Sequence, residues 1–98
     1  MDILVGNYYA NDHKEDGVID TNVILILPNK ENTPQFQTRT ETMWIRNGEV
    51  KQIYANNWIS DFFKREATPE EIALFKEHRS RIDELPNYSD AILEDIAE

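Results

Sequence analysis

Apolar and polar residues follow two different periods along the chain. The first half contains short runs rich in β-branched and aromatic residues, and the most apolar run, residues 23–27, has no polar position. A continuous run of this kind is typical of a central strand covered on both faces, or on one face with a dimer partner on the other. Beyond residue 54 the period lengthens to about 3.6 residues, which indicates helices. We therefore expect strands first and helices afterwards.

Asn47-Gly48 lies between two such runs and is the strongest short-range signal for a β-hairpin. A type I′ turn needs positive φ at both central residues, and Asn and Gly tolerate it best. A two-residue turn pairs Arg46 with Glu49, and we expect an ion pair between them. The same register gives the hairpin two faces. The predicted core face carries Met43, Ile45, Val50 and Tyr54. The predicted outer face carries Trp44, Lys51, Thr42 and Ile53.

The position of Trp44 depends on the conformation of this turn. A three-residue loop with a bulge would place Trp44 opposite Val50 and move it toward the core, because a one-residue slip exchanges the two faces of a strand. We adopt the type I′ register, which makes Trp44 an outer-face residue available to a partner.

Two or three helices are expected after the hairpin. The first, near residues 57–66, is capped by Asn56 or Asn57. Its apolar stripe consists of Trp58, Ile59, Phe62 and Phe63. The second, near residues 69–84, begins with Thr68 as N-cap, Pro69 in the first turn and Glu71 completing a capping box. A short third helix is expected near residues 89–96.

Together these elements predict an α+β fold. A four-stranded antiparallel β-meander, with strands near residues 3–9, 18–27, 36–46 and 49–55, is followed by the helices, which pack on one face. Residues 10–17 are expected to form a polar loop. The length of the chain, residues 1–98, suits a single domain.

The net charge at pH 7 is −9, and it is unevenly distributed. From Asp83 to Glu98 there are six acidic residues and no basic one. The basic stripe that direct nucleic-acid binding usually needs is not visible, so no direct contact with nucleic acid is expected. The acidity favours a basic protein partner or serves solubility alone.

The absence of cysteine limits both chemistry and location. Disulfides, thiolate metal ligands and a cysteine nucleophile are excluded, and a reducing cytoplasm is favoured. No apolar run approaches the roughly 20 residues of a membrane helix. We expect a cytoplasmic protein that does not bind a membrane.

Motifs for catalysis or metal binding are weak. Residues 12–23 match a calcium loop at first, but Lys14 stands where a ligand is needed and Val23 where glutamate is needed. A transition metal at His13 would need a second imidazole, and only the distant His78 could supply it. No serine lies in a nucleophile motif, and the three glycines form no phosphate loop. We predict no catalytic residue, no metal and no cofactor, and therefore no enzyme.

The aromatic residues favour a contact surface on the outer face of the sheet. Tyr8 and Tyr9 are neighbours on a strand and must point to opposite faces, so one of them is expected on the outer face. A helix covering this face is the alternative to a partner. The predicted partner-binding residues are Trp44, Lys51, Ile53 and Tyr8, with Asp90, Glu94 and Asp95 as electrostatic guides.

In size, acidity and lack of cysteine the chain is similar to phage or mobile-element accessory proteins, some of which occupy the nucleic-acid groove of a host enzyme. The resemblance implies a non-enzymatic interaction module, an inhibitor or adaptor, acting on a basic, nucleic-acid-handling protein. Self-association through the sheet is a second possible use of the same surface. The alternative function is a small-ligand or nucleotide-binding domain, monomeric or dimeric. Its pocket would lie between sheet and helices and use Tyr54, Trp58 and His78.

Overall fold

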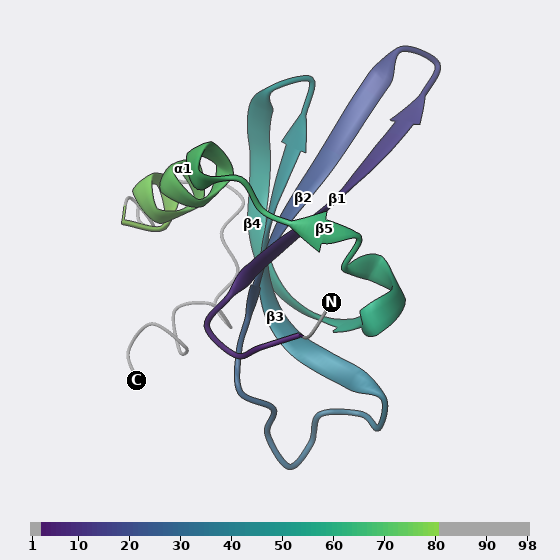
Figure 1. The fold of residues 1–98 in the computed structure, drawn as a ribbon, viewed down its shortest axis with the longest axis vertical. Coiled ribbons are helices and arrows are strands. Elements are labelled where there is room, and N and C mark those ends of the chain that lie inside the picture. The colour runs from purple at the N-terminus through teal and green to yellow at the C-terminus, as the bar shows by residue number, and fades with distance from the viewer. Residues whose placement is uncertain (1–2, 81–98) are drawn as a thin grey trace.

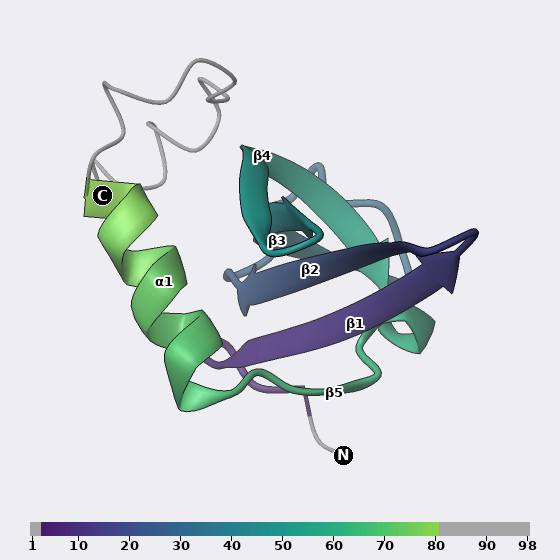
Figure 2. The same cartoon turned by 90° about the horizontal axis from the view of Figure 1, so that it is seen from above.

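The computed structural model describes residues 3–80, which form a five-stranded antiparallel sheet with one α-helix against it (Figure 1). The elements are β1 (Tyr8–Glu15), β2 (Val18–Ile26), β3 (Gln37–Arg46), β4 (Glu49–Ile59), the 3-10 turn η1 (Ser60–Phe62), β5 (Arg65–Glu66) and α1 (Pro69–Ser80). Their order across the sheet is β4-β3-β2-β1-β5. The first four strands form a meander, and the chain then returns to pair β5 with β1. Figure 2 shows that the sheet is strongly twisted and that α1 lies to one side of it.

The central strand β2 is buried on both faces, as its unbroken apolar run predicts. Val23 and Leu25 point toward α1 and pack around Phe75. Ile24 and Ile26 point to the opposite face. We call these the helix face and the outer face. The outer-face cluster is completed by Tyr9 and Phe63, with Ile3 and Trp58 packed against it. The N-terminal segment and the chain around η1 therefore cover part of the outer face.

Arg65 connects α1 to the sheet. Its Nη1 and Nη2 donate to the Glu71 carboxylate at 2.7 and 2.8 Å, and its Nε donates to Asp12 Oδ2 at 2.9 Å. This fork geometry is the strong form of a charge-assisted bond. Arg65 lowers the pKa of both carboxyls by hydrogen bonding. One side chain thus links β1, β5 and the first turn of the helix.

The predicted start of the second helix is confirmed. Thr68 Oγ1 accepts from the Glu71 amide at 3.2 Å, and the Thr68 amide donates to Glu71 Oε1 at 2.9 Å. This reciprocal pair is the capping box that the sequence predicts. The helix is described as far as Ser80. The remainder of that prediction, residues 81–84, and the predicted helix at 89–96 lie outside the described residues.

The expected fold class is wrong, because the sheet has five strands and residues 57–66 form no α-helix. β4 continues through most of that stretch. Asn56 does not cap a helix, since its Oδ1 accepts from the hydroxyls of Thr40 and Thr42 at 2.8 and 2.9 Å. Trp58 Nε1 also donates to Thr42 Oγ1, at 2.9 Å. These side-chain bonds fasten β4 to β3, and they outweigh the helical spacing of the apolar residues.

The first strand is also displaced from its expected place. It begins at Tyr8 instead of near residue 3, and it occupies most of the stretch expected to be a polar loop. Polar side chains pair across the strands here: Asn22 Nδ2 donates to Asn11 Oδ1 at 2.9 Å, and Thr21 Oγ1 donates to Asp12 Oδ1 at 2.8 Å. Cross-strand hydrogen bonds of this kind stabilise a sheet without apolar alternation.

The turn between β3 and β4 has the predicted conformation. Asn47 and Gly48 have φ of 48° and 83°, and Ile45 pairs with Val50 as expected. A bulge then follows, because Trp44 pairs with Gln52 and skips one residue. Beyond this point the predicted register is one residue out of step.

The bulge exchanges the faces of two predicted residues. Ile53 is 1% exposed and belongs to the helix-face core, so its placement on the outer face is wrong. Tyr54 pairs with Thr42 and lies on the outer face instead of in the core. Trp44 remains on the outer face, as the type I′ register requires.

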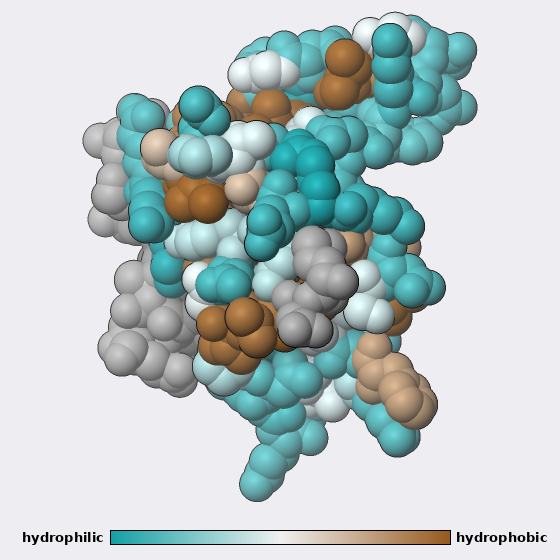
Figure 3. Space-filling view, viewed as in Figure 1, coloured by the Kyte–Doolittle hydropathy of each residue, from teal (hydrophilic) through white to brown (hydrophobic). Residues whose placement is uncertain are grey.

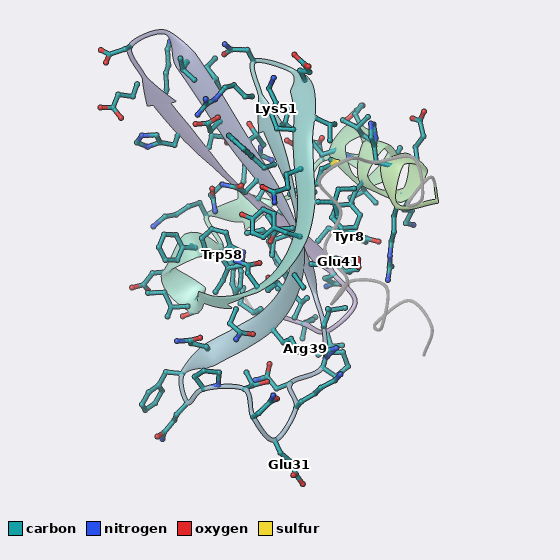
Figure 4. The ribbon with its side chains drawn as sticks, turned by 180° about the vertical axis from the view of Figure 1, so that it is seen from behind. Tyr8, Glu31, Arg39, Glu41, Lys51 and Trp58 are labelled. Atoms are coloured by element: carbon teal, nitrogen blue, oxygen red, sulfur yellow. The ribbon has the colours of Figure 1, made fainter. Side chains whose placement is uncertain are left out.

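Glu41 is a buried carboxylate on the helix face of β3. It is fully buried, and its Oε2 lies 3.0 Å from Arg79 Nε of α1. Within the described residues neither carboxylate oxygen makes a hydrogen bond, so the contact is an ion pair without aligned donors. Figure 4 shows Glu41 beside Tyr8 on the side of the sheet that carries α1. Burial raises the pKa of Glu41 to about 7, against the opposing effect of Arg79 and Arg39.

The substitution Glu41→Gln is expected to remove the pH dependence that the Glu41 carboxyl gives to the stability of the fold. The carboxyl pKa rises from 4.5 to about 7 on folding, so the native state binds this proton more tightly and stability falls as pH rises between those values. A shift of this size corresponds to at most about 3 kcal/mol. Urea unfolding at about pH 5 and about pH 8 measures the effect. Relative to the wild type, the free energy of unfolding of the variant should be higher at about pH 8 than at about pH 5. The same difference between the two proteins at both pH values would contradict the raised pKa of Glu41.

Candidate functional site: the hairpin end of the sheet

Both two-residue turns of the sheet lie at the same end, which we call the hairpin end. The first turn is Asp16-Gly17, with φ of 51° and 79°, and the second is Asn47-Gly48. The two hairpins are joined by a pair of bonds between Asn47 and Ile19: the Asn47 amide donates to Ile19 O, and the Ile19 amide donates to Asn47 Oδ1, each at 2.9 Å. The turn residue that fixes the register of one hairpin therefore also holds the other in place.

Three side chains on the outer face form a tight cluster just below these turns. Asp20 Oδ1 accepts from Trp44 Nε1 at 2.9 Å and from Arg46 Nε at 2.8 Å, and Asp20 Oδ2 accepts from Arg46 Nη2 at 3.1 Å. The Arg46 guanidinium also lies over the Trp44 ring, 5.0 Å from its centroid. The expected ion pair of Arg46 with Glu49 is replaced by this pairing across β2 and β3. The indole is thus fixed by its edge and by its face.

The electrostatics of this cluster suit recognition better than proton transfer. The hydrogen bonds from Arg46 and then from Trp44 lower the pKa of Asp20 to about 2. A carboxylate that holds its charge at every physiological pH is a poor general acid or base, because catalysis needs a pKa near the working pH. Asp20 therefore acts as a fixed anion that positions Arg46 and Trp44.

A groove of about 240 Å³ adjoins the cluster. It is lined by His13, Glu15, Asp16, Val18, Asp20 and Arg46. The three carboxylates and one guanidinium give the groove a net charge of about −2, with the imidazole counted as neutral. His13 Nε2 lies 3.2 Å from Glu15 Oε2 on the rim. The groove is an acidic recess with one apolar wall.

The structure separates the residues predicted to bind a partner. Trp44 is half-buried on the outer face, and Lys51 is exposed at the bulge of β4, 3.4 Å from a Glu49 oxygen. Tyr8 lies on the helix face, where its ring packs edge-on against Phe75 at 5.4 Å. Ile53 is in the core. Asp90, Glu94 and Asp95 lie outside the described residues. The expected single surface of four side chains is therefore not formed.

The pocket expected for a small ligand is not assembled either. Tyr54 and Trp58 lie on the outer face, whereas His78 lies on α1, whose core residues pack on the helix face. His78 Nδ1 is 2.9 Å from the Leu74 carbonyl oxygen of its own helix. The sheet therefore lies between His78 and the other two residues.

Sequence reasoning missed Asp20 and the first turn. Asp16-Gly17 belongs to the same class of turn signal as Asn47-Gly48, and it could have located the end of β1. No short sequence pattern marks Asp20 as a site residue, because its partners Trp44 and Arg46 are more than 20 residues away and lie on another strand. Only the pairing of β2 with β3 brings them together.

Comparison of the chain with protein-family models, curated proteins and solved structures finds no match. Over residues 3–80, no group of three or more potential metal-ligating side chains is arranged to hold an ion. Within the same range no helix is long and apolar enough to cross a membrane. The geometry of the hairpin end is therefore the basis for a functional proposal.

The Asp20 pKa is expected to report the integrity of this cluster. Arg46→Met should raise it from about 2 toward the ordinary value of 3.8, and Trp44→Phe should raise it less, because Arg46 contributes the larger effect. Carboxyl carbon NMR titration measures both. Since a lowered carboxyl pKa stabilises the fold above the unfolded value, the wild type should lose this contribution as pH falls from about 4 to 2. An unchanged Asp20 pKa in Arg46→Met would contradict the structure.

Proposed function

We propose that the protein is a non-enzymatic interaction module that binds a basic protein partner through the groove at its hairpin end. The observation that carries the proposal is the acidic groove beside a fixed tryptophan. Such a module would act as an inhibitor or adaptor. Proteins that handle nucleic acid present basic surfaces, so they are the class of partner whose charge fits.

The groove has the features that a lysine or arginine side chain of a partner requires. Val18 offers apolar surface to the methylene stem, while Glu15 and Asp16 stand where the charged head would lie. Asp20 is already paired with Arg46, so the negative charge that faces the partner comes from Asp16 and from Glu15, whose carboxylate also contacts the His13 imidazole. Trp44 beside the groove adds a rigid aromatic contact, and aromatic residues are over-represented at the centre of interfaces.

The shape of the sheet makes this end accessible. Figure 1 shows the β1–β2 hairpin extending as an arm beyond the rest of the sheet, and Figure 2 shows its tip far from α1. A projecting acidic arm can enter a concave basic surface. Charge of this sign also accelerates encounter with a basic partner, an effect that salt screens.

Removing the rim charges is expected to weaken binding of a basic ligand. A tri-arginine peptide titrated into labelled protein should shift the amide signals of Glu15, Asp16 and Val18. Glu15→Gln with Asp16→Asn should reduce the affinity by about twofold to thirtyfold, since two exposed ion pairs contribute about 0.2–1 kcal/mol each. Asn tolerates the positive φ at residue 16, so the turn is preserved. Affinity should also fall as salt rises from about 50 to 200 mM.

A matched control removes two acidic charges elsewhere. Glu31→Gln with Asp61→Asn reduces the net negative charge by the same two charges, and Figure 4 shows Glu31 at the end of the molecule opposite Lys51. This variant should bind the peptide as the wild type does. Equal weakening by both variants would show that general acidity, and not the groove, attracts the peptide.

A further inference from the structure

β1 is an edge strand that β5 covers along only part of its length. It has 8 residues, and β5 pairs with Tyr9 and Ala10. Figure 1 shows the hairpin of β1 and β2 extending past β5, so the outer part of β1 has β2 on one side and no strand on the other. An edge of this kind presents main-chain donors and acceptors on which a further strand can form.

The hydrogen bonds at the inner part of β1 show in which direction each main-chain group points. The carbonyl of Tyr8 accepts from the Ala67 amide at 3.1 Å, and the carbonyl of Ala10 accepts from the Lys64 amide at 3.2 Å. The even-numbered residues of β1 therefore turn their main-chain groups toward β5. Just before the strand, the carbonyl of Asn7 accepts from β2, so the odd-numbered residues face β2.

The same alternation continues to the tip of the hairpin. The register between β1 and β2 is regular from Tyr8 to Glu15, without a bulge. Because the direction of main-chain groups alternates along a strand, the amides and carbonyls of Asp12 and Lys14 point away from β2, beyond the end of β5. Within residues 3–80 these groups have no hydrogen-bond partner. We call this stretch, Asp12–Lys14, the free edge.

The free edge runs beside the acidic groove of the hairpin end. Tyr9 belongs to the outer-face core, so His13 and Glu15, which follow it by even steps, also lie on the outer face, where they line the groove. Figure 3 shows that the surface of this hairpin is mainly hydrophilic, with small apolar patches. A strand added to the free edge would have every second side chain on the outer face, next to the groove.

Charge decides which kind of strand fits the free edge. On the outer face, a basic side chain opposite Glu15 would make a favourable cross-strand pair, with Asp16 close by. On the helix face, the Lys14 ammonium repels a cation, and Asp12 is already paired with Arg65. A strand that alternates basic and uncharged residues satisfies both faces. A second copy of this chain would instead bring two acidic hairpins together, in a protein of net charge −9.

We propose that a basic segment of the partner binds in an extended conformation, as a strand added antiparallel to β1 at the free edge. In strand addition the main-chain hydrogen bonds give affinity, and the alternate side chains give specificity. The antiparallel direction continues that of β5. This inference rests on the proposed function, because the groove supplies the charge, and it adds the binding mode and the alternating pattern that the partner must carry.

A short capped peptide in which threonine and arginine alternate tests this mode with the wild-type protein. In the proposed register the arginines lie on the outer face, and the threonines lie opposite Asp12 and Lys14 and donate their amides to β1. N-methylation of the threonine amides should therefore weaken binding about fivefold or more. N-methylation of the arginine amides, which point away from β1, should leave the affinity within about twofold.

A pair of protein variants tests the same hydrogen bonds from the other side. Lys14→Pro removes the outward amide and keeps the bonds to β2, and an edge strand tolerates proline at such a position. Lys14→Ala is the matched control, because it removes the same charge and keeps the amide. Lys14→Pro should bind the unmodified peptide about twofold to tenfold more weakly than Lys14→Ala. Thermal unfolding of both variants checks the fold.

Hydrogen exchange gives a direct readout in the wild type. The amides of Asp12 and Lys14 face solvent, so they should exchange quickly in the free protein and more slowly once the peptide is bound. The amide of His13 faces β2, so its exchange should change little.

Two sets of results separate this inference from the proposed function. If both methylated peptides and Lys14→Pro bind normally, while Glu15→Gln with Asp16→Asn weakens binding, side chains alone hold the partner. Strand addition is then wrong, and the groove stands. If no peptide binds, or if the rim variant and the distant control variant lose affinity equally, the proposed function is wrong and the strand proposal fails with it.

Discussion

The burial of four consecutive apolar side chains on β2 is the constraint on which the structure depends. Residues 23–26 are each at most 6% exposed, so the sheet must be covered on both faces along this strand. A five-stranded sheet with one helix has cover for only one face. The chain covers the other face with its N-terminal segment and with the stretch around η1, which bring Ile3 and Phe63 onto Ile24 and Ile26.

Because both faces of β2 must be covered, the chain returns to pair with β1 before it forms α1. β5 contains two residues, yet it places Arg65 between Asp12 and Glu71 and so fixes where the helix begins. The capping box then orients the first turn, and Phe75 reaches the helix-face core. A helix directly after β4 would leave the outer face of β2 open to water, at a cost of about 25 cal/mol for each Å² of apolar surface.

Local signals predicted the turn between β3 and β4 and the start of α1, and they failed where distant residues decide the structure. Asn47-Gly48 and the Thr68 capping box are each complete within four residues, and both are confirmed. The bulge at Lys51 is not encoded by any short pattern, yet it moves Ile53 into the core. Because strand faces alternate with a period of two, one inserted residue reverses every assignment beyond it.

The same distinction applies to the functional residues. Trp44 was placed correctly, because its face depends only on the turn. Its partner Asp20 was not found, since the contact requires the pairing of β2 with β3. Glu41 lies two residues before Met43 and four before Ile45 on β3. Because side chains alternate between the two faces of a strand, this spacing alone would have placed Glu41 on the core face.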